Sequence, residues 1–289
     1  MTPAWLQPFE YGYMLNAIGV STLVGAVCAF LSCYLMLKGW SLIGDALSHA
    51  IVPGVAGAYL LGLSFSAGAF LAGGLAAGAM VFLQQRTRLK QDVIIGLIFS
   101  SFFGLGLFMV SLAPAAVNVQ TIVMGNILAV SPGDTRQLVL IGAVCLAVLA
   151  LKWRDLLVVF FDESHARSIG LRPVLLKGVF FALLSACTVA ALQTVGALLV
   201  VAMIVTPGAT AYLLSDRFAR VIAIAVFIGA ATGFAGAYAS CFLNGATGGV
   251  IVVLQTLVFL AVFLAAPKHG LWAGRRLARR AAAQEEEPA

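Results

Sequence analysis

The chain has 289 residues, of which 62% are hydrophobic and only 10% are charged. A soluble domain of this size carries about 25% charged residues, so this chain cannot cover its surface with polar groups. Its mean hydropathy of +1.06 predicts an integral membrane protein and leaves no room for a soluble domain.

Apolar runs follow one another along the chain, and a helix needs roughly 20 such residues to cross a bilayer. The runs cover residues 13–37, 46–62, 66–84, 93–113, 137–151, 177–194, 196–214, 221–241 and 248–266. We therefore predict an all-α, polytopic membrane protein with about nine transmembrane helices, in a range of about 8–10. Residues 1–267 would form a single transmembrane domain, and residues 268–289 a disordered cytoplasmic tail.

The polar breaks between these runs alternate between basic and almost uncharged. If the N-terminus lies outside, 16 of the 17 Lys and Arg residues fall on the cytoplasmic side, with Arg136 as the exception. This positive-inside pattern predicts a cytoplasmic C-terminus and explains the net charge of +6 without a nucleic-acid partner. No basic region or small-residue cleavage site marks a signal peptide, so we expect the first span to be an uncleaved anchor.

Near the start of the second run, an acid and an imidazole stand in an apolar setting. Asp45 and His49 are four residues apart and therefore share one face of a helix. A carboxylate oxygen and an imidazole nitrogen suit a divalent manganese, iron or zinc ion, and ionisable groups in a membrane usually serve a pathway. The alternative is that Asp45 caps the helix N-terminus and His49 only packs.

The same run contains a proline and a glycine that favour an interrupted helix. Interrupted helices at membrane depth usually line a cavity, so we assign Ser48, Pro53 and Gly54 to the transport pathway. Thr206 and Pro207 repeat this pattern in a later run. There the alternatives are a second interruption, with a hydroxyl ligand from Thr206, and a structural kink.

Residues 114–136 contain an apolar stretch that is too short to cross the membrane. Pro114 and the Ser131-Pro132-Gly133-Asp134 sequence bracket it. We therefore predict a re-entrant or half-crossing helix in this segment.

Residues 152–177 form a sizeable cytoplasmic loop that contains signals for a helix of about two turns. Asp162 suits the N-cap, acidic Glu163 the first turn and Gly170 the left-handed position after the last turn, while Pro173 prevents continuation. Because so short a helix is marginal alone in water, something must dock on it. The alternatives are another protein and the membrane surface, but the helix lacks the strongly amphipathic face that membrane anchoring needs.

Several functions are excluded by missing motifs. The sequence has no phosphate-binding loop of the Gly-x-x-x-x-Gly-Lys-Ser/Thr type, so any nucleotide hydrolysis must come from another chain. It has no His-Glu-x-x-His or Gly-x-Ser-x-Gly motif and no paired membrane aspartates, so we expect no intramembrane enzyme. Its five cysteines stand singly in apolar runs and predict small core residues rather than disulfides or a thiolate metal site.

Three segments carry a resemblance to a known family. They are Gly44-Asp45-Ala46-Leu47-Ser48-His49-Ala50-x-x-Pro53-Gly54, Asp162-Glu163-x-x-Ala166-x-x-x-Gly170, and Val195-Gly196-Ala197-Leu198-Leu199 continuing to Thr206-Pro207-x-Ala209. They resemble the permease subunit of bacterial ATP-binding cassette importers for manganese, zinc or iron. The resemblance covers essentially the whole transmembrane region.

This resemblance implies a nonenzymatic subunit of the bacterial inner membrane that moves a divalent metal inward, with Asp45 and His49 as ligands and no tightly bound cofactor. It implies three partners: a cytoplasmic ATP-binding cassette ATPase, an extracytoplasmic metal-binding protein and a second, identical or paralogous permease chain. The ATPase is expected to dock on the short cytoplasmic helix. The coupling residues would be Asp162, Glu163, His165, Ala166, Arg167 and Gly170.

Manganese is the favoured substrate, with iron or zinc as alternatives. A carboxylate and an imidazole without a cysteine pair suit manganese or ferrous iron at least as well as zinc, and residues 161–167 resemble the manganese and iron branch of the family. A different function would be an ion-coupled secondary transporter, in which Asp45 and His49 relay protons without an ATPase. Such proteins often have inverted repeats, but the two halves of this chain show no internal similarity.

Overall fold

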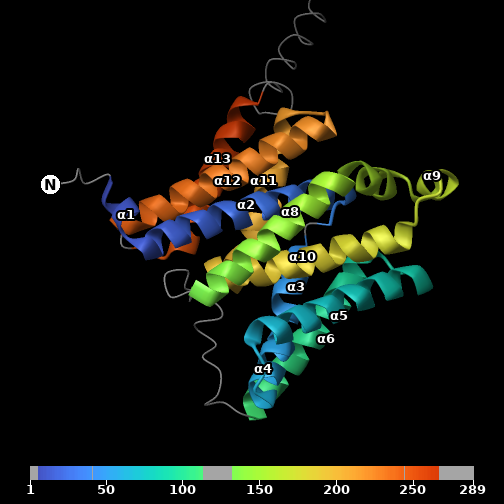
Figure 1. The fold of residues 1–289 in the computed structure, drawn as a ribbon. Helices are drawn as coiled ribbons and strands as arrows, with labels where there is room; N and C mark the ends of the chain where they lie inside the picture. Colours follow the sequence, from blue (N-terminus) through green and yellow to red (C-terminus); the bar gives the residue numbers. More distant parts are fainter. Residues whose placement is uncertain (1–5, 41, 113–131, 244, 267–289) are drawn as a thin grey trace, which may run out of the picture.

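The computed structural model describes residues 6–40, 42–112, 132–243 and 245–266 (Figure 1). All regular secondary structure in these ranges is helical, which confirms the predicted all-α fold. The helices are α1 (Gln7–Glu10), α2 (Gly12–Lys38), α3 (Ile43–Ala50), α4 (Val52–Leu61), α5 (Phe65–Arg86), α6 (Gln91–Leu112), α8 (Pro132–Phe161), α9 (Glu163–Ser168), α10 (Pro173–Val195), α11 (Ala197–Leu214), α12 (Phe218–Leu243) and α13 (Thr247–Ala265). The segment predicted to cross halfway lies outside the described residues, except for 132–136 at the start of α8.

Each predicted apolar run coincides with a helix or, in one case, with two helices. Among the described residues, six helices are long and apolar enough to cross a membrane: α2, α5, α6, α10, α12 and α13. The count of about nine is therefore not confirmed. The run at 46–62 is divided into α3 and α4, and at 1.5 Å per residue these extend only about 12 and 15 Å, too short for either to span alone.

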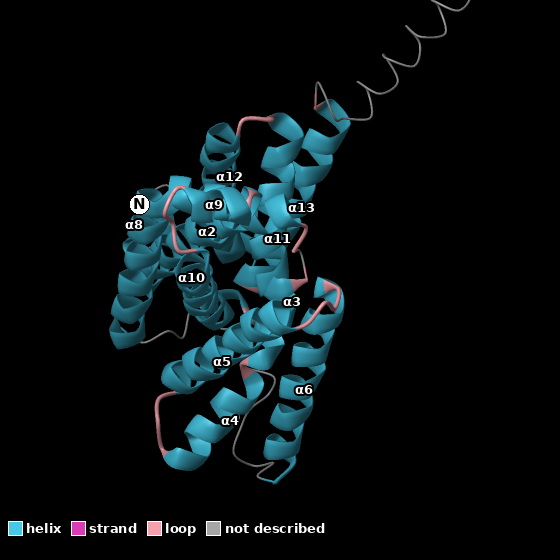
Figure 2. Ribbon diagram, turned by 90° about the vertical axis from the view of Figure 1, so that its right-hand side faces the viewer, coloured by secondary structure: helices cyan, strands magenta, loops and turns pink. Residues whose placement is uncertain are grey.

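The helices form two groups. In the larger group, α2 contacts α8, α10, α11 and α12, while α4, α5 and α6 pack together in the smaller group (Figure 1). The groups meet where α5 packs on α10 and at α3, which contacts α5 and α6 of the smaller group and α10 and α11 of the larger one (Figure 2). The segment that carries Asp45 and His49 is thus part of the junction between the two groups.

Aromatic side chains fill the core of the larger group beside the end of α2. The buried Tyr34 ring packs edge-on against Phe160 of α8 and Phe180 of α10, and its hydroxyl donates to the Trp153 carbonyl at 2.9 Å. All five cysteines are free. Those that are buried, as predicted for core residues, are Cys28, Cys33, Cys145 and Cys187.

Glycines produce the closest helix contacts in both groups. A Cβ atom on Gly25 of α2 would lie 2.3 Å from the carbonyl oxygen of Gly229 of α12. In the smaller group, a Cβ atom on Gly54 of α4 would lie 2.1 Å from the carbonyl oxygen of Gly68 of α5. Because helices in a membrane associate mainly through van der Waals packing, these small residues allow the backbones to approach closely.

Candidate functional site

Helix α3 has Asp45 in its first turn and His49 in its last turn. The N-cap residue is Leu42, and no side chain makes a capping hydrogen bond there. Asp45 is therefore not the N-cap, although a carboxylate in the first turn still interacts favourably with the helix dipole.

The two predicted ligands lie side by side. Nδ1 of His49 is 3.3 Å from Oδ1 of Asp45 and 3.0 Å from the backbone carbonyl oxygen of Asp45. The Ser48 hydroxyl donates to that same carbonyl at 2.8 Å. Since a carbonyl oxygen can only accept, a hydrogen bond to it requires the tautomer with the proton on Nδ1, and that tautomer leaves Nε2 available to bind an ion.

Helix α6 holds the imidazole in place. Phe99 and Phe103 both pack edge-on against the His49 ring, with ring centroids 5.3 and 5.4 Å away. The His49 side chain is 20% exposed, whereas that of Asp45 is 43% exposed. The carboxylate is thus accessible while packing fixes the imidazole. Sequence reasoning missed both phenylalanines because they act through the contact of α3 with α6, which leaves no local signal.

As metal ligands, these two side chains would supply only part of a coordination shell. Among the described residues, no group of three or more His, Cys, Asp and Glu side chains could hold a metal ion. Because a zinc ion takes four ligands and manganese takes more, Asp45 and His49 alone would not complete the shell of either ion.

The interruption predicted near Pro53 is present, but it lies at Ile51. Helix α3 ends one residue before Ile51, and α4 begins one residue after it. Pro53 therefore occupies the first turn of α4, where its missing N–H removes no helical hydrogen bond. Gly54 follows it and packs against the backbone of α5.

The interruption considered at Thr206-Pro207 is absent, because α11 continues through Pro207. Ser32 of α2 reaches into α11 at this point. Its hydroxyl donates to the Val205 carbonyl at 3.1 Å and accepts the Gly208 N–H at 3.0 Å. A side chain of α2 thus inserts beside the hydrogen-bond ladder of α11 and bonds backbone groups on either side of the proline. Sequence reasoning missed Ser32 because this contact joins residues 173 and 176 positions apart.

Helix α9 starts as predicted. Asp162 is the N-cap, and its Oδ1 accepts the backbone N–H groups of Ser164 at 2.8 Å and His165 at 3.1 Å. These bonds satisfy two of the free donors at the start of the helix.

Helix α9 also ends as predicted. Gly170 has a φ of +83°, and its N–H donates to the Arg167 carbonyl at 3.1 Å, while the Leu171 N–H donates to the Ala166 carbonyl at 3.0 Å. This pair of bonds is a Schellman motif, which places a left-handed residue after the last turn. Pro173 then begins α10.

A partly buried ion pair fixes α9 to α10. Glu163 accepts hydrogen bonds from Lys177 of α10 at 2.5 Å and from Arg167 at 2.8 Å. Burial alone raises the pKa of Glu163, but the hydrogen bonds and charges of Lys177 and Arg167 outweigh it and hold this pKa below its usual range. Ala166 is buried, whereas His165 and Arg167 are exposed. One side of α9 is therefore anchored and the other is open to a partner.

Comparison with known proteins identifies the family. The model of the ABC 3 transport family matches residues 10–266. The chelated iron transport system membrane protein YfeC of Yersinia pestis is 65% identical over 278 residues, covering 95% of each chain. The manganese transport system membrane protein MntB of Synechocystis is 44% identical over 270 residues, covering 93% of this chain and 88% of that protein.

A solved structure shows the same fold. A chain of PsaBC from Streptococcus pneumoniae in complex with Fab is 34% identical, with a TM-score of 0.82, and the match covers 93% of this chain and 98% of that one. These matches confirm the predicted resemblance to metal-transport permeases and the prediction of a membrane transport subunit rather than an enzyme. The chain belongs to the ABC 3 transport family.

Proposed function

We propose that this chain is the permease subunit of an ATP-binding cassette importer that moves a divalent transition metal into the cytoplasm. The observation that carries the proposal is the Asp45–His49 pair, 3.3 Å apart, on the short helix between two groups of helices. Because α3 contacts both groups, any movement of one against the other changes the surroundings of these ligands. Alternating access in transporters is largely such a movement around a fixed site.

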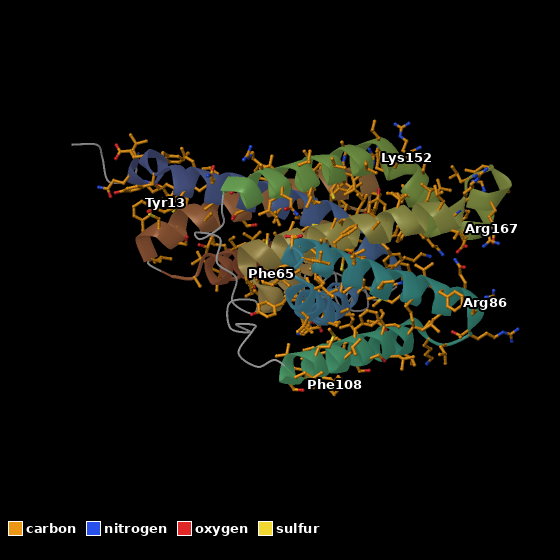
Figure 3. All side chains as sticks on the ribbon, turned by 60° about the horizontal axis from the view of Figure 1, so that its bottom comes forward. Tyr13, Phe65, Arg86, Phe108, Lys152 and Arg167 are labelled. Atoms are coloured by element: carbon orange, nitrogen blue, oxygen red, sulfur yellow. The ribbon has the colours of Figure 1, made fainter. Side chains whose placement is uncertain are left out.

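The proposed topology has about nine crossings, with the N-terminus outside and the C-terminal tail, residues 268–289, in the cytoplasm. It counts α3 and α4 as one interrupted crossing and adds α8 and α11 to the helices long enough to span. The distribution of charge supports this orientation. Arg86, Lys152 and Arg167 lie toward one end of the molecule and Tyr13 toward the opposite end, as expected for a basic cytoplasmic face (Figure 3).

The proposed partners follow from the open side of α9 and from the resemblance to importer permeases. A cytoplasmic ATPase would dock on α9, whose coupling residues Asp162, Glu163, His165, Ala166, Arg167 and Gly170 form a preorganised helix with one open side. A second permease chain would flank the transport pathway, and an extracytoplasmic metal-binding protein would deliver the ion.

Manganese is the proposed substrate, with iron or zinc as alternatives. A carboxylate and an imidazole are ligands that suit manganese and ferrous iron. The names of the relatives refer to iron and to manganese transport, which supports these two metals without ranking them.

The deciding experiment is reconstitution in liposomes. The tagged chain is purified with the ATPase that accompanies it, and uptake of radioactive manganese is measured with and without ATP and the binding protein. We expect uptake to require ATP and to be reduced by excess ferrous iron more than by zinc. Uptake by this chain alone would overturn the proposal and favour an ion-coupled secondary transporter.

A further inference from the structure

A pocket of about 440 Å³ opens beside α9. Apolar residues from the end of α2, the end of α8 and the start of α12 contribute much of its lining, including Leu157, Val158 and Phe218. Its polar lining comes from two places in the chain, with Asp162 at the N-cap of α9 and Asp216 in the turn between α11 and α12. The pocket thus joins the predicted coupling helix to the end of α11.

The charge of this lining is opposite to that of its surroundings. Lys38 and Arg154 lie near the same ends of α2 and α8, Arg217 follows Asp216 in the turn, and Lys152 is paired with Asp155. The pocket lining itself contains two carboxylates and, among the described residues, no Lys or Arg. An apolar cavity with acidic groups fits a long side chain that has an aliphatic stem and a cationic head.

We propose that this pocket receives an arginine or lysine side chain of the cytoplasmic ATPase. The inference rests on the proposed function and adds a second contact, besides α9, between the permease and the ATPase. Asp162 and His165 belong both to the pocket and to the α9 segment, so a partner docked on α9 also covers the pocket. The aliphatic stem packs on Leu157 and Phe218, and the cationic head lies near Asp162 and Asp216.

This second contact connects the ATPase to the metal ligands. The pocket includes Ser215 and Tyr212, at the end of α11, and α11 contacts α3. The ATPase would therefore hold α9 and the α11–α12 turn together. A shift of its basic side chain would move α11 against the helix that carries Asp45 and His49.

The first test fills the pocket or reverses its charge and then measures the affinity of the detergent-solubilised permease for the ATPase. Val158→Trp places a bulky ring in the apolar lining, and Asp216→Lys puts a cation where the incoming cation would lie. We expect each variant to bind the ATPase at least about tenfold more weakly. Leu151→Trp is the matched control, because Leu151 is on the same helix and 81% exposed. Circular dichroism and thermal unfolding identify any variant that fails to fold.

The second test identifies the occupant directly. Tyr212 lines the pocket and is 57% exposed, so p-benzoylphenylalanine at position 212 can report what enters it. Ultraviolet light should cross-link it to an ATPase peptide that contains Arg or Lys. Cross-linking only to lipid or to residues 268–289 of this chain, or unchanged ATPase affinity in folded pocket variants, would overturn the inference. If the unmodified permease binds no ATPase, the proposed function itself fails.

Discussion

The Pro53-Gly54 and Pro207-Gly208 sequences place the same dipeptide in two apolar runs, but the helices around them differ. At the first site the chain changes helix just before the proline, from α3 to α4. At the second site α11 continues, and the Ser32 hydroxyl bonds backbone groups on both sides of the proline. The dipeptide alone therefore does not determine whether the helix stays continuous, and at the second site a neighbouring helix supplies both a donor and an acceptor.

The two glycines are needed for different reasons. A Cβ atom on Gly54 would lie 2.1 Å from the Gly68 carbonyl oxygen, which is backbone. A Cβ atom on Gly208 would lie 2.3 Å from the Ser32 hydroxyl oxygen, which is a side chain, but also 2.8 Å from the Ser32 backbone carbonyl carbon. The first contact cannot be relieved by changing a neighbouring side chain, whereas the side-chain part of the second can.

The largest expected difference between the two segments is in transport. Asp45→Ala and His49→Ala should each lower ATP-driven manganese uptake at least about 100-fold, because each removes a ligand. Thr206→Val should lower it less than about tenfold, since a hydroxyl is a weaker ligand than a carboxylate or an imidazole. Uptake is measured in liposomes at equal amounts of assembled complex. Equal losses of uptake in all three variants would contradict the expected difference between the two segments. Loss of assembly in the Asp45 and His49 variants would favour a packing role for these residues.

The second difference is in stability. Gly54→Ala should lower the free energy of unfolding by about 3 kcal/mol or more, because the new methyl group meets backbone. Gly208→Ala should cost about 1–3 kcal/mol, and the double variant Gly208→Ala, Ser32→Gly should be more stable than the sum of the two single effects predicts. Thermal unfolding in detergent measures these effects. A harmless Gly54→Ala, or additive effects of Gly208→Ala and Ser32→Gly, would show that the helices adjust in another way.

Local patterns predicted much of this structure. The Asp162 cap and the left-handed Gly170 define α9 within a few residues of each other, so they could be predicted from the sequence. The spacing of Asp45 and His49 likewise predicted their approach, because residues four apart share a helix face.

Contacts between distant segments could not be predicted in this way. Ser32 and Phe99 act on residues of other helices, and Lys177 pairs with Glu163 across a loop. Nothing near them in the sequence indicates these roles. For the same reason the sequence left open whether the helix is interrupted or only kinked at Pro207.

Removal of the Ser32 hydroxyl should have a smaller effect than the glycine changes. Ser32→Ala leaves the Gly208 N–H and the Val205 carbonyl without this partner, which should cost about 1–2 kcal/mol. Ser100→Ala is the matched control, because the Ser100 hydroxyl is exposed and donates at 3.2 Å only to Leu97 of its own helix. The control should change the free energy of unfolding by less than about 0.5 kcal/mol. Equal effects of the two substitutions would mean that the contact between α2 and α11 contributes nothing specific.

The smallest expected effect is the coupling between Ser32 and Pro207. Pro207→Ala restores a backbone N–H and removes the proline ring from the preceding turn, so α11 can re-form its own hydrogen-bond ladder. Ser32→Ala should then cost about 0.5–1 kcal/mol less in the Pro207→Ala background than in the unmodified chain. Pro53→Ala is the control, because Pro53 lies in the first turn of α4 and shares no hydrogen-bond partner with Ser32. A double-mutant cycle from denaturant unfolding measures both couplings. Additive effects of Ser32→Ala and Pro207→Ala would show that the hydroxyl does not compensate for the proline.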